Sequence, residues 1–354
     1  MTRKVEVGSS IVDLSDEGVI FEATADNPAP DDLYFNDEYY NFPFILKDTN
    51  IEDEQQQINA VKTFKTAFNS LEESVVNKNW EEVQSKIDVK SFAEYFLLDE
   101  FTLNRDAFIY STFFYQNSPN DIICCGPAWD FDLAFANPTL PMGSKKIITF
   151  EDPFRCSVYY TCDYIYKSEE RNFQIFGDLM EFPQMRKIVD DIYRNNLKNK
   201  LDDILKKIDD FSAYIKNSAL KNENKWSTID RWYSIGLEES TNQLKSFIKN
   251  RFMFMDTIYA SNCDFDDGIY SVTMNGITKE FNIIKSEDGY YVFYDTQNQL
   301  PLWIYDNSEE DVAIVKSDYN SSTDPDFVKW SICDAGDGKY YICNKKNRFS
   351  PRLP

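Results

Sequence analysis

Hydrophobic residues at three- and four-residue spacing predict helices in the central part of the chain. Residues 52–76 form such a stripe, with acidic residues in the first turn, from Ile58, Val61, Phe64, Phe68, Leu71 and Val75. Asp88 is a suitable N-cap for a second helix that runs to about Leu103. Helical periodicity returns in several segments between residues 172 and 260, with breaks at Phe182-Pro183 and at 226–236.

Alternating apolar and polar residues predict short strands in the first 125 residues. Residues 5–22 alternate like two strands around Asp16-Glu17-Gly18, and a third strand covers Phe42 to Lys47. Residues 107–115 and 121–125 are typical of two antiparallel strands. Together with the helices, these strands indicate an α+β domain over residues 1–262.

The pattern changes at Cys263, where helical spacing gives way to short alternating runs separated by turn residues. These runs cover residues 268–274, 289–294, 302–305, 312–315, 329–333 and 339–343. We therefore expect a small all-β domain over residues 263–354. The phrase Lys329–Ile332, followed by Gly338–Ile342, resembles one lobe of a ricin-type β-trefoil, and a small β-sandwich is the alternative.

Composition excludes several kinds of chemistry. The chain has 354 residues, and 37 basic against 60 acidic side chains give a formal net charge of −23. Such an acidic surface repels phosphate backbones, so we expect no nucleic-acid partner. The chain contains no histidine, which excludes Ser-His-Asp and Cys-His catalysis and imidazole metal sites. Seven cysteines form no C-x-x-C pair, so a structural zinc site is not expected either.

Two acidic residues stand out inside an apolar stretch. The stretch runs from Gly126 to Phe135 and contains Asp130 and Asp132, which lie on the same side of an extended backbone. Charges in apolar surroundings are costly to desolvate, and hard carboxylate oxygens directed at one point suit Mg²⁺ or Mn²⁺. The alternative is a pair of acids that cap a helix or accept hydrogen bonds from buried N–H groups.

A second polar cluster lies where the helix that begins after Asp88 ends. Asn104 and Asp106 fall at this junction, from which side chains can point into a cleft. The alternative is a helix cap by Asn104 and a surface turn at Asp106. An Asn-x-Asp, a two-strand hairpin and an Asp-x-Asp in succession resemble the way kinase-like folds place a catalytic acid and a metal-binding acid.

The combination of Asn104-Arg105-Asp106 with the string Gly-Pro-Ala-Trp-Asp-Phe-Asp-Leu of residues 126–133 resembles the signature of the spore coat protein H (CotH) kinase family. The resemblance covers roughly residues 5–260. Further blocks that are similar to family blocks, in the same order, are residues 45–47, 95–106, 177–179, 219–226 and 238–258.

The resemblance implies an atypical protein kinase domain, with a mostly helical C-lobe and short strands. By position, Asp106 would be the catalytic, base-like aspartate and Asp130 the metal-binding aspartate. Asn104 and Asp132 would complete the metal and phosphate shell, and Lys47 is a candidate nucleotide contact, with a surface lysine at a strand end as the alternative. The implied cofactors are ATP and Mg²⁺ or Mn²⁺. The aromatic residues Trp129 and Phe131 are expected to pack rather than to touch ligand.

The sequence also departs from the family pattern. In the family, a block with basic and glycine features precedes the strand that matches residues 5–13, and here the chain starts after it. No G-x-G-x-x-G or G-K-[ST] motif is present. We therefore expect an N-terminally incomplete kinase domain that binds ATP weakly and has little or no activity in this form.

The predicted function is transfer of the ATP γ-phosphoryl group to Ser or Thr of a secreted or surface protein. One alternative is a non-catalytic surface or spore-coat protein whose β domain binds carbohydrate or protein. Another is a metal-dependent glycosyltransferase with Asp130-x-Asp132 as its D-x-D motif. The resemblance implies an extracellular or cell-surface bacterial protein, although residues 1–4 lack a signal-peptide core. No apolar run reaches the roughly 20 residues of a membrane span.

Overall fold

A computed structural model describes residues 5–7, 10–12, 14–104, 106–132, 134–135, 175–226, 236–259, 265–274, 276–305, 314–316, 325–336 and 338–345. The chain divides into two compact units. Unit 1 comprises Met1–Ile192 and Lys216–Ser240, and unit 2 comprises Tyr193–Ile215 and Thr241–Pro354. The boundary predicted between residues 262 and 263 lies inside unit 2, and independent folding of residues 263–354 stays a prediction.

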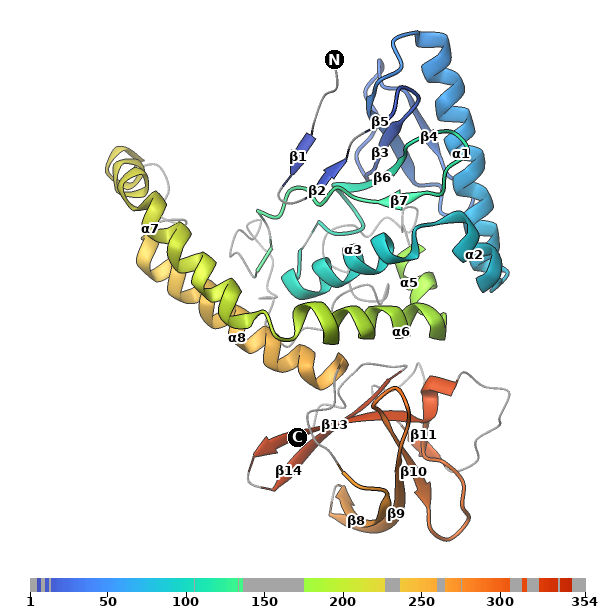
Figure 1. Ribbon diagram of the computed structural model, residues 1–354, viewed down its shortest axis with the longest axis vertical. Helices are drawn as coiled ribbons and strands as arrows, with labels where there is room; N and C mark the ends of the chain where they lie inside the picture. The colour runs from blue at the N-terminus through green and yellow to red at the C-terminus, as the bar shows by residue number, and fades with distance from the viewer. Residues whose placement is uncertain are drawn as a thin grey trace. The chain divides into compact units, whose positions relative to one another are not determined.

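Unit 1 contains a five-stranded antiparallel sheet (Figure 1). The strand order is β4 (Tyr34–Asn36), β5 (Pro43–Thr49), β3 (Val19–Ala23), β6 (Thr112–Gln116) and β7 (Cys124–Cys125). The predicted strand at residues 42–47 is confirmed as β5. The predicted hairpin around Asp16–Gly18 is wrong, because β1 (Val5–Val7) and β2 (Ser10–Val12) pair with each other while β3 pairs with β5 and β6.

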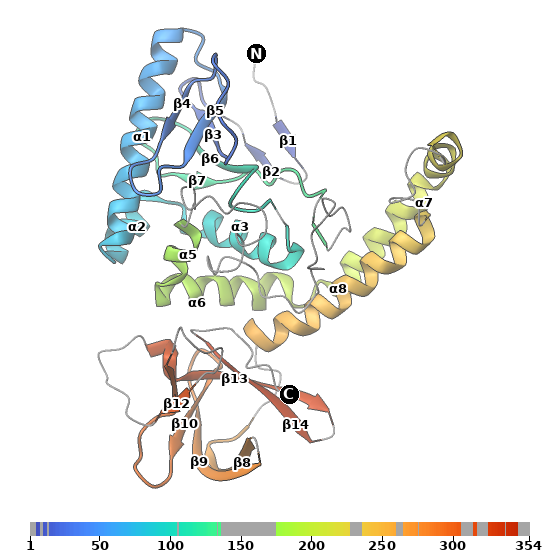
Figure 2. The ribbon, with the colours of Figure 1, turned by 180° about the vertical axis from the view of Figure 1, so that it is seen from behind.

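The helix α1 (Glu54–Val76) covers one face of this sheet, as both views show (Figures 1 and 2). Asp53 caps the helix by accepting a hydrogen bond from the backbone N–H of Gln56. Stacked and tilted rings fill the interface. Their centroid distances are 4.3 Å for Phe21–Phe64, 4.5 Å for Phe44–Phe68 and 5.4 Å for Phe68–Phe114. The apolar stripe that predicted this helix is therefore the stripe that packs on the sheet.

Two further helices lead to the edge of the sheet. The predicted helix after Asp88 is confirmed as α3 (Val89–Thr102), and the Asp88 carboxylate accepts from the N–H groups of Lys90 and Ser91. The sequence did not predict α2 (Trp80–Lys86), a short helix that Asn79 caps. The predicted strand at residues 107–115 begins only at Thr112. Residues 106–110 form a turn, because the N–H groups of Ile109 and Tyr110 both donate to the carbonyl oxygen of Asp106.

The second half of the chain has the predicted helical segments. They are α5 (Ile175–Met180), α6 (Pro183–Ile192), the π-helical turn η1 (Tyr193–Leu197), α7 (Leu201–Trp226) and α8 (Leu237–Tyr259). The break predicted at Phe182-Pro183 separates α5 from α6. Within the described part of the chain, no helix combines the length and the apolar character that a membrane crossing requires.

The strands of unit 2 agree with the predicted all-β region. A five-stranded antiparallel sheet has the order β14 (Lys339–Asn344), β13 (Lys329–Gly336), β10 (Tyr291–Asp295), β9 (Ile277–Lys285) and β8 (Gly268–Met274). A two-stranded ribbon joins β11 (Trp303–Tyr305) to β12 (Ile314–Lys316), and the short 3-10 helix η2 (Pro325–Val328) precedes β13. The sequence missed β9. A β-trefoil or sandwich arrangement stays a prediction.

A cluster of charged residues surrounds Asp288, which lies in the turn between β9 and β10. The Asp288 carboxylate accepts from the ammonium groups of Lys329 at 2.7 Å and Lys345 at 2.9 Å. Lys345 is only 2% exposed and also lies 3.4 Å from Asp326. The guanidinium of Arg194 in η1 donates to the Asp288 backbone carbonyl. These contacts tie the β9–β10 turn to η1 and to the C-terminal end of the sheet.

Candidate metal centre

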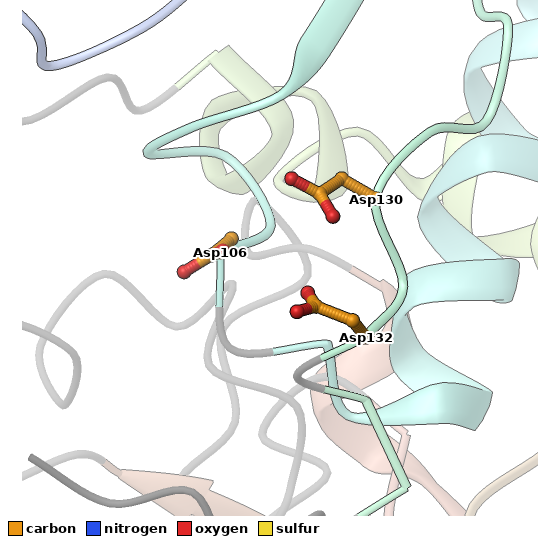
Figure 3. A group of neighbouring side chains, drawn as sticks. All are labelled: Asp106, Asp130 and Asp132. Atoms are coloured by element: carbon orange, nitrogen blue, oxygen red, sulfur yellow. The ribbon is translucent and has the colours of Figure 1, made fainter. Parts of the chain in front are cut away.

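Three carboxylates from two segments of unit 1 converge at one point. Asp106 opens the turn between α3 and β6, whereas Asp130 and Asp132 follow β7. One oxygen of each carboxylate lies within 4.8 Å of the others. Figure 3 shows Asp130 and Asp132 on one segment and Asp106 on the segment beside it. The structure thus brings together three of the residues that the sequence singled out.

The backbone around this cluster adopts conformations that L-residues rarely take. Positive φ angles occur at Leu103 (49°), Phe108 (64°), Ser111 (52°), Asp130 (62°) and Phe135 (57°). Each such residue costs roughly 1–3 kcal/mol, and strained residues concentrate at functional sites. The expectation that Asp130 and Asp132 lie in extended backbone is wrong, because the left-handed conformation at Asp130 redirects the chain between them.

Electrostatic repulsion within the cluster favours a bound cation. Burial raises the pKa of Asp130 above its usual range, and the charge of Asp132 and a hydrogen bond to it raise the pKa further. A hydrogen bond with the Ser111 side chain acts in the opposite direction. A divalent cation stabilises the ionised form of such neighbouring carboxylates. Carboxylate oxygens are hard ligands, so this set of donors fits Mg²⁺ or Mn²⁺.

Lys47 lies in a β-bulge of β5. The pairing of β3 with β5 shifts register between Ile20, opposite Asp48, and Phe21, opposite Leu46, which leaves Lys47 as the additional residue. A bulge changes the direction of a side chain relative to a regular strand. The Lys47 ammonium lies 2.7 Å from the Glu22 carboxylate, and the side chain remains 41% exposed. Lys47 is therefore held in place by an ion pair but still accessible.

Glu22 links this lysine to the acid cluster. Its carboxylate accepts a hydrogen bond of 3.1 Å from the backbone N–H of Ser111, and the Ser111 side chain in turn interacts with Asp130. Lys47 lies in β5 and Glu22 in the neighbouring strand β3, Ser111 immediately precedes β6, and Asp130 lies in the segment after β7. Sequence reasoning missed Glu22 and Ser111. The available signal was the charged Glu22 in the otherwise apolar strand of residues 19–23.

Asn104 is a buried neighbour of Asp106 in the chain. It is 5% exposed, and its side-chain oxygen accepts a hydrogen bond of 3.3 Å from the Asp106 N–H. This bond holds the start of the turn that carries Asp106. The adjacent Asp99 is fully buried, and burial raises the pKa of its carboxyl well above the usual range, whereas the Asn104 side chain lowers it. Metal or cofactor contact by Asn104 stays a prediction.

The aromatic residues of the motif differ in their packing. Phe131 is half-buried, in line with the expectation that it packs. Trp129 is 47% exposed, and its only ring contact among the described residues is an edge-to-face contact with Phe113 at 6.5 Å. The expectation that Trp129 is mainly a packing residue is therefore met only in part.

Comparison with known proteins agrees with the resemblance noted in the sequence. A family model described as CotH kinase protein matches residues 13–255. This range contains the three carboxylates and also Glu22 and Lys47. No curated protein matches the chain.

Proposed function

Because the chain belongs to the CotH kinase family, we propose that unit 1 is an atypical protein kinase domain that transfers the γ-phosphoryl group of ATP to Ser or Thr. The observation that carries this proposal is the convergence of Asp106, Asp130 and Asp132 within 4.8 Å. Family membership supports a kinase-like activity and a protein substrate. A kinase-like fold, a secreted or surface location and a surface-protein acceptor belong to the proposal.

Asp130 and Asp132 are the proposed metal ligands. Their adjacent carboxylates offer several oxygen atoms from one short segment, as a phosphate-bound divalent cation requires. The cation, when bound, neutralises charge on the transferred phosphoryl group. The Ser111 hydroxyl holds the Asp130 side chain, and the half-buried Phe131 anchors the segment between the two acids.

Asp106 is the proposed base-like residue. Its half-buried carboxylate approaches the other two from a separate segment, so it can accept a proton on the acceptor side of the site. In the reaction, the acceptor hydroxyl oxygen forms a new P–O bond to the γ-phosphorus while the β–γ bridging P–O bond breaks. ADP leaves with the electron pair, and the hydroxyl proton passes to Asp106.

Lys47 supplies the cation that the sequence motifs alone did not show. An exposed ammonium paired with a carboxylate is suited to contact ATP phosphates, as the lysine–glutamate pair of protein kinases does. Glu22 would hold Lys47 in position through their 2.7 Å contact. The pair lies within β3 and β5, and it offers a candidate phosphate contact beside the acid cluster.

The glycosyltransferase alternative is less well supported by the fold. Nucleotide-sugar enzymes with a D-x-D motif usually bind the nucleotide on a parallel βαβ arrangement. All of the pairings described in the unit 1 sheet are antiparallel.

A phosphotransfer assay tests the proposal. The full chain is incubated with γ-labelled ATP, Mn²⁺ or Mg²⁺ and generic protein acceptors, and incorporated label is measured. Asp106→Asn, Asp130→Asn and Lys47→Ala should each reduce transfer by about 100-fold or more, the usual loss when an acid–base or electrostatic group is removed. Asp203→Asn, on an exposed helical acid, is the matched control and should retain full transfer.

Thermal melting of each variant separates loss of chemistry from loss of the fold. Full transfer by Asp106→Asn together with Asp130→Asn would overturn the proposal. An inactive parent that binds neither Mn²⁺ nor Mn²⁺-ATP by calorimetry would do the same.

A further inference from the structure

The five-stranded sheet of unit 2 ends on one side at β8 (Figure 2). Among the strands that the structure describes, β8 pairs with β9 alone. The pairing runs from Gly268–Ile283 to Met274–Ile277 without a shift in register. Within the described part of the chain, β8 is therefore a regular edge strand with one side of its backbone unpaired.

The hydrogen-bonding groups of every second residue in β8 point away from β9. Met274 pairs with Ile277, and two residues join them in the sequence, so this pair exchanges hydrogen bonds as in other two-residue hairpins. Hydrogen-bonded pairs then recur at every second residue along the ladder. The backbone N–H and C=O groups of Ile269, Ser271 and Thr273 consequently lie on the free edge.

The edge at β8 has none of the features that usually keep sheet edges from pairing, namely charged side chains, proline or a bulge. Its sequence is Gly-Ile-Tyr-Ser-Val-Thr-Met, and the Ile269 side chain is 67% exposed. The opposite edge strand, β14, begins with Lys339, and its pairing with β13 is irregular between Asp334 and Gly336. Of the two edges, β8 is thus the one that can accept another strand.

We propose that β8 pairs with β8 of a second copy of this chain, antiparallel and about a two-fold axis at Ser271. In this register the outward backbone groups of the two Ser271 residues face each other, and Ile269 of each copy lies opposite Thr273 of the other. Both exposed Ile269 side chains lose contact with water on pairing, which favours the dimer. The dimer does not depend on the proposed phosphotransfer.

The charge of the chain favours a second copy as the partner of this edge. The net charge of −23 makes two copies repel each other over most of their surfaces, so a contact between copies requires a neutral segment. In the proposed register, residues of β8 lie opposite residues of β8, and none of them is charged. Because other surfaces repel, dimerisation should strengthen as the salt concentration rises from about 0.05 to 0.5 M.

Sedimentation velocity of the full chain over a range of concentrations measures the dimer. Ser271→Pro removes the N–H group that points to the free edge, and proline is tolerated at such edge positions. The variant loses two hydrogen bonds per dimer, so its dimer Kd should rise by about 5- to 150-fold. Ser271→Ala keeps the N–H group and is the matched control, which should dimerise like the parent. Circular dichroism and thermal melting check that each variant is folded.

Pairs of charged substitutions test the register without proline. In Ile269→Lys/Thr273→Glu, each introduced ammonium lies opposite an introduced carboxylate of the other copy, whereas in Ile269→Glu/Thr273→Glu two carboxylates meet at both ends. The double-acid variant should therefore dimerise about 10-fold or more weakly than the lysine–glutamate variant. Asn242→Glu/Ser246→Glu adds the same charge at two exposed positions of α8, and its Kd should stay close to that of the parent when salt screens distant charges.

A parent that stays monomeric at every concentration and at both salt levels would overturn the proposal and leave the edge to a strand of another protein. A parent dimer that Ser271→Pro leaves intact would also overturn it, because the contact would then lie on another surface. Equal dimerisation of the double-acid and lysine–glutamate variants would exclude the proposed register. If Ser271→Pro does not fold, the two charged variants decide the question.

Discussion

Glu72 is a carboxyl group buried against the turn between β4 and β5. Neither of its oxygens has a hydrogen-bond partner among the described residues. The neighbouring Asp37 already accepts hydrogen bonds from the backbone N–H groups of Tyr39, Tyr40 and Phe42. Burial, with the charge of Asp37 as a second cause, raises the pKa of Glu72 from 4.5 to about 10. Glu72 is therefore neutral at pH 7.

This shift predicts that the stability of unit 1 decreases in alkali. A raised folded-state pKa contributes stability that is complete below pH 4.5 and is lost as the pH rises toward 10. Glu72→Gln removes the titrating group and keeps its shape, so it should be more stable than the parent by about 1 kcal/mol or more at pH 9. The difference should shrink as the pH falls toward 5.

Urea unfolding at pH 5, 7 and 9 measures this difference. Glu73→Gln, on the exposed neighbour, is the control and should follow the parent at every pH. A Glu72→Gln variant that is equally destabilised at all three values would show that the carboxylate is ionised and satisfied in the folded protein.

The Asp130 carboxylate should give a metal response in thermal melts. The metal-free Asp130→Asn variant should be as stable as the parent, or slightly more stable, because a repelling charge has been removed. The parent should gain roughly 1.4 kcal/mol at about ten times the metal dissociation constant, and the variant should gain little. Melting with and without Mn²⁺ measures this. A destabilised variant beside a parent that ignores Mn²⁺ would indicate a structural carboxylate instead.

At the scale of single residues, the sequence predicts the acidic residues of the site but not the residues that hold them in position. Asp130 and Asp132 stand out because charges are rare inside apolar stretches, and Asp106 because it lies in a polar cluster at a helix end. Glu22 is also a charge in an apolar strand, but its role depends on the bulge that carries Lys47, and Ser111 has no comparable signal. The bulge cannot be read from the sequence, because it arises from the pairing of β3 with β5, which lie apart in the chain.

Among the helices, α1 should contribute most of its stability through aromatic packing on the sheet. Phe68 is fully buried and contacts the rings of Phe44 and Phe114. Phe68→Ala should therefore cost about 3–5 kcal/mol, the usual range for a buried phenylalanine. Val76→Ala, at a 51% exposed position in the same helix, should change stability by less than about 0.5 kcal/mol. Urea unfolding measures both, and similar costs for the two variants would contradict this account.

Helices and strands with a clear apolar pattern in the sequence were predicted, and those without one were missed. The helices α1 and α3 combine an apolar stripe with a capping aspartate, and both were predicted. The strand β9 was missed because its first four residues are exposed, so they lack apolar alternation. The error at residues 107–111 has a different cause. These residues are apolar and aromatic, yet two hydrogen bonds to the Asp106 carbonyl close a turn that composition does not reveal.

The two units should respond to pH in opposite directions. Burial alone would raise the pKa of Asp288 in unit 2, but hydrogen bonds from Lys329 and Ser286 and the charge of Lys345 hold it below its usual range. A lowered folded-state pKa contributes stability that is present above about pH 4 and is lost as the pH falls further. Acid should therefore weaken unit 2, whereas alkali weakens unit 1 through Glu72.

Scanning calorimetry between pH 3 and 9 should therefore show two unfolding transitions, one for each unit. The unit 2 transition should fall on acidification, and the unit 1 transition should fall on alkalinisation. Asp288→Asn should destabilise unit 2 at pH 7, because Lys345 remains buried without its main counter-charge, and should flatten the acid dependence. One transition that moves uniformly in parent and variants would contradict the independent titration of the two units.

At the scale of the whole molecule, the sequence predicts the family and the change from helical to β structure near Cys263. It does not predict that Tyr193–Ile215 belongs with the β strands in unit 2. That assignment depends on contacts such as the hydrogen bond from Arg194 to the Asp288 carbonyl, 94 residues away in the chain. Helical periodicity shows which face of a segment is apolar, but it does not show which distant partner the segment joins.

The bulge in β5 also constrains how this gene can change in length. Loss of one residue from a regular stretch of strand turns every side chain beyond it to the opposite face of the sheet. Lys47 is the additional residue of the bulge, so its deletion would leave Leu46 opposite Phe21 and Asp48 opposite Ile20 in an uninterrupted ladder. An in-frame deletion of codon 47 should therefore remove the ion-pair partner of Glu22 but keep the register of β5, whereas deletion of Ile45 should misalign the strand. Loss of a single residue should consequently be tolerated better at this position than in the regular part of β5.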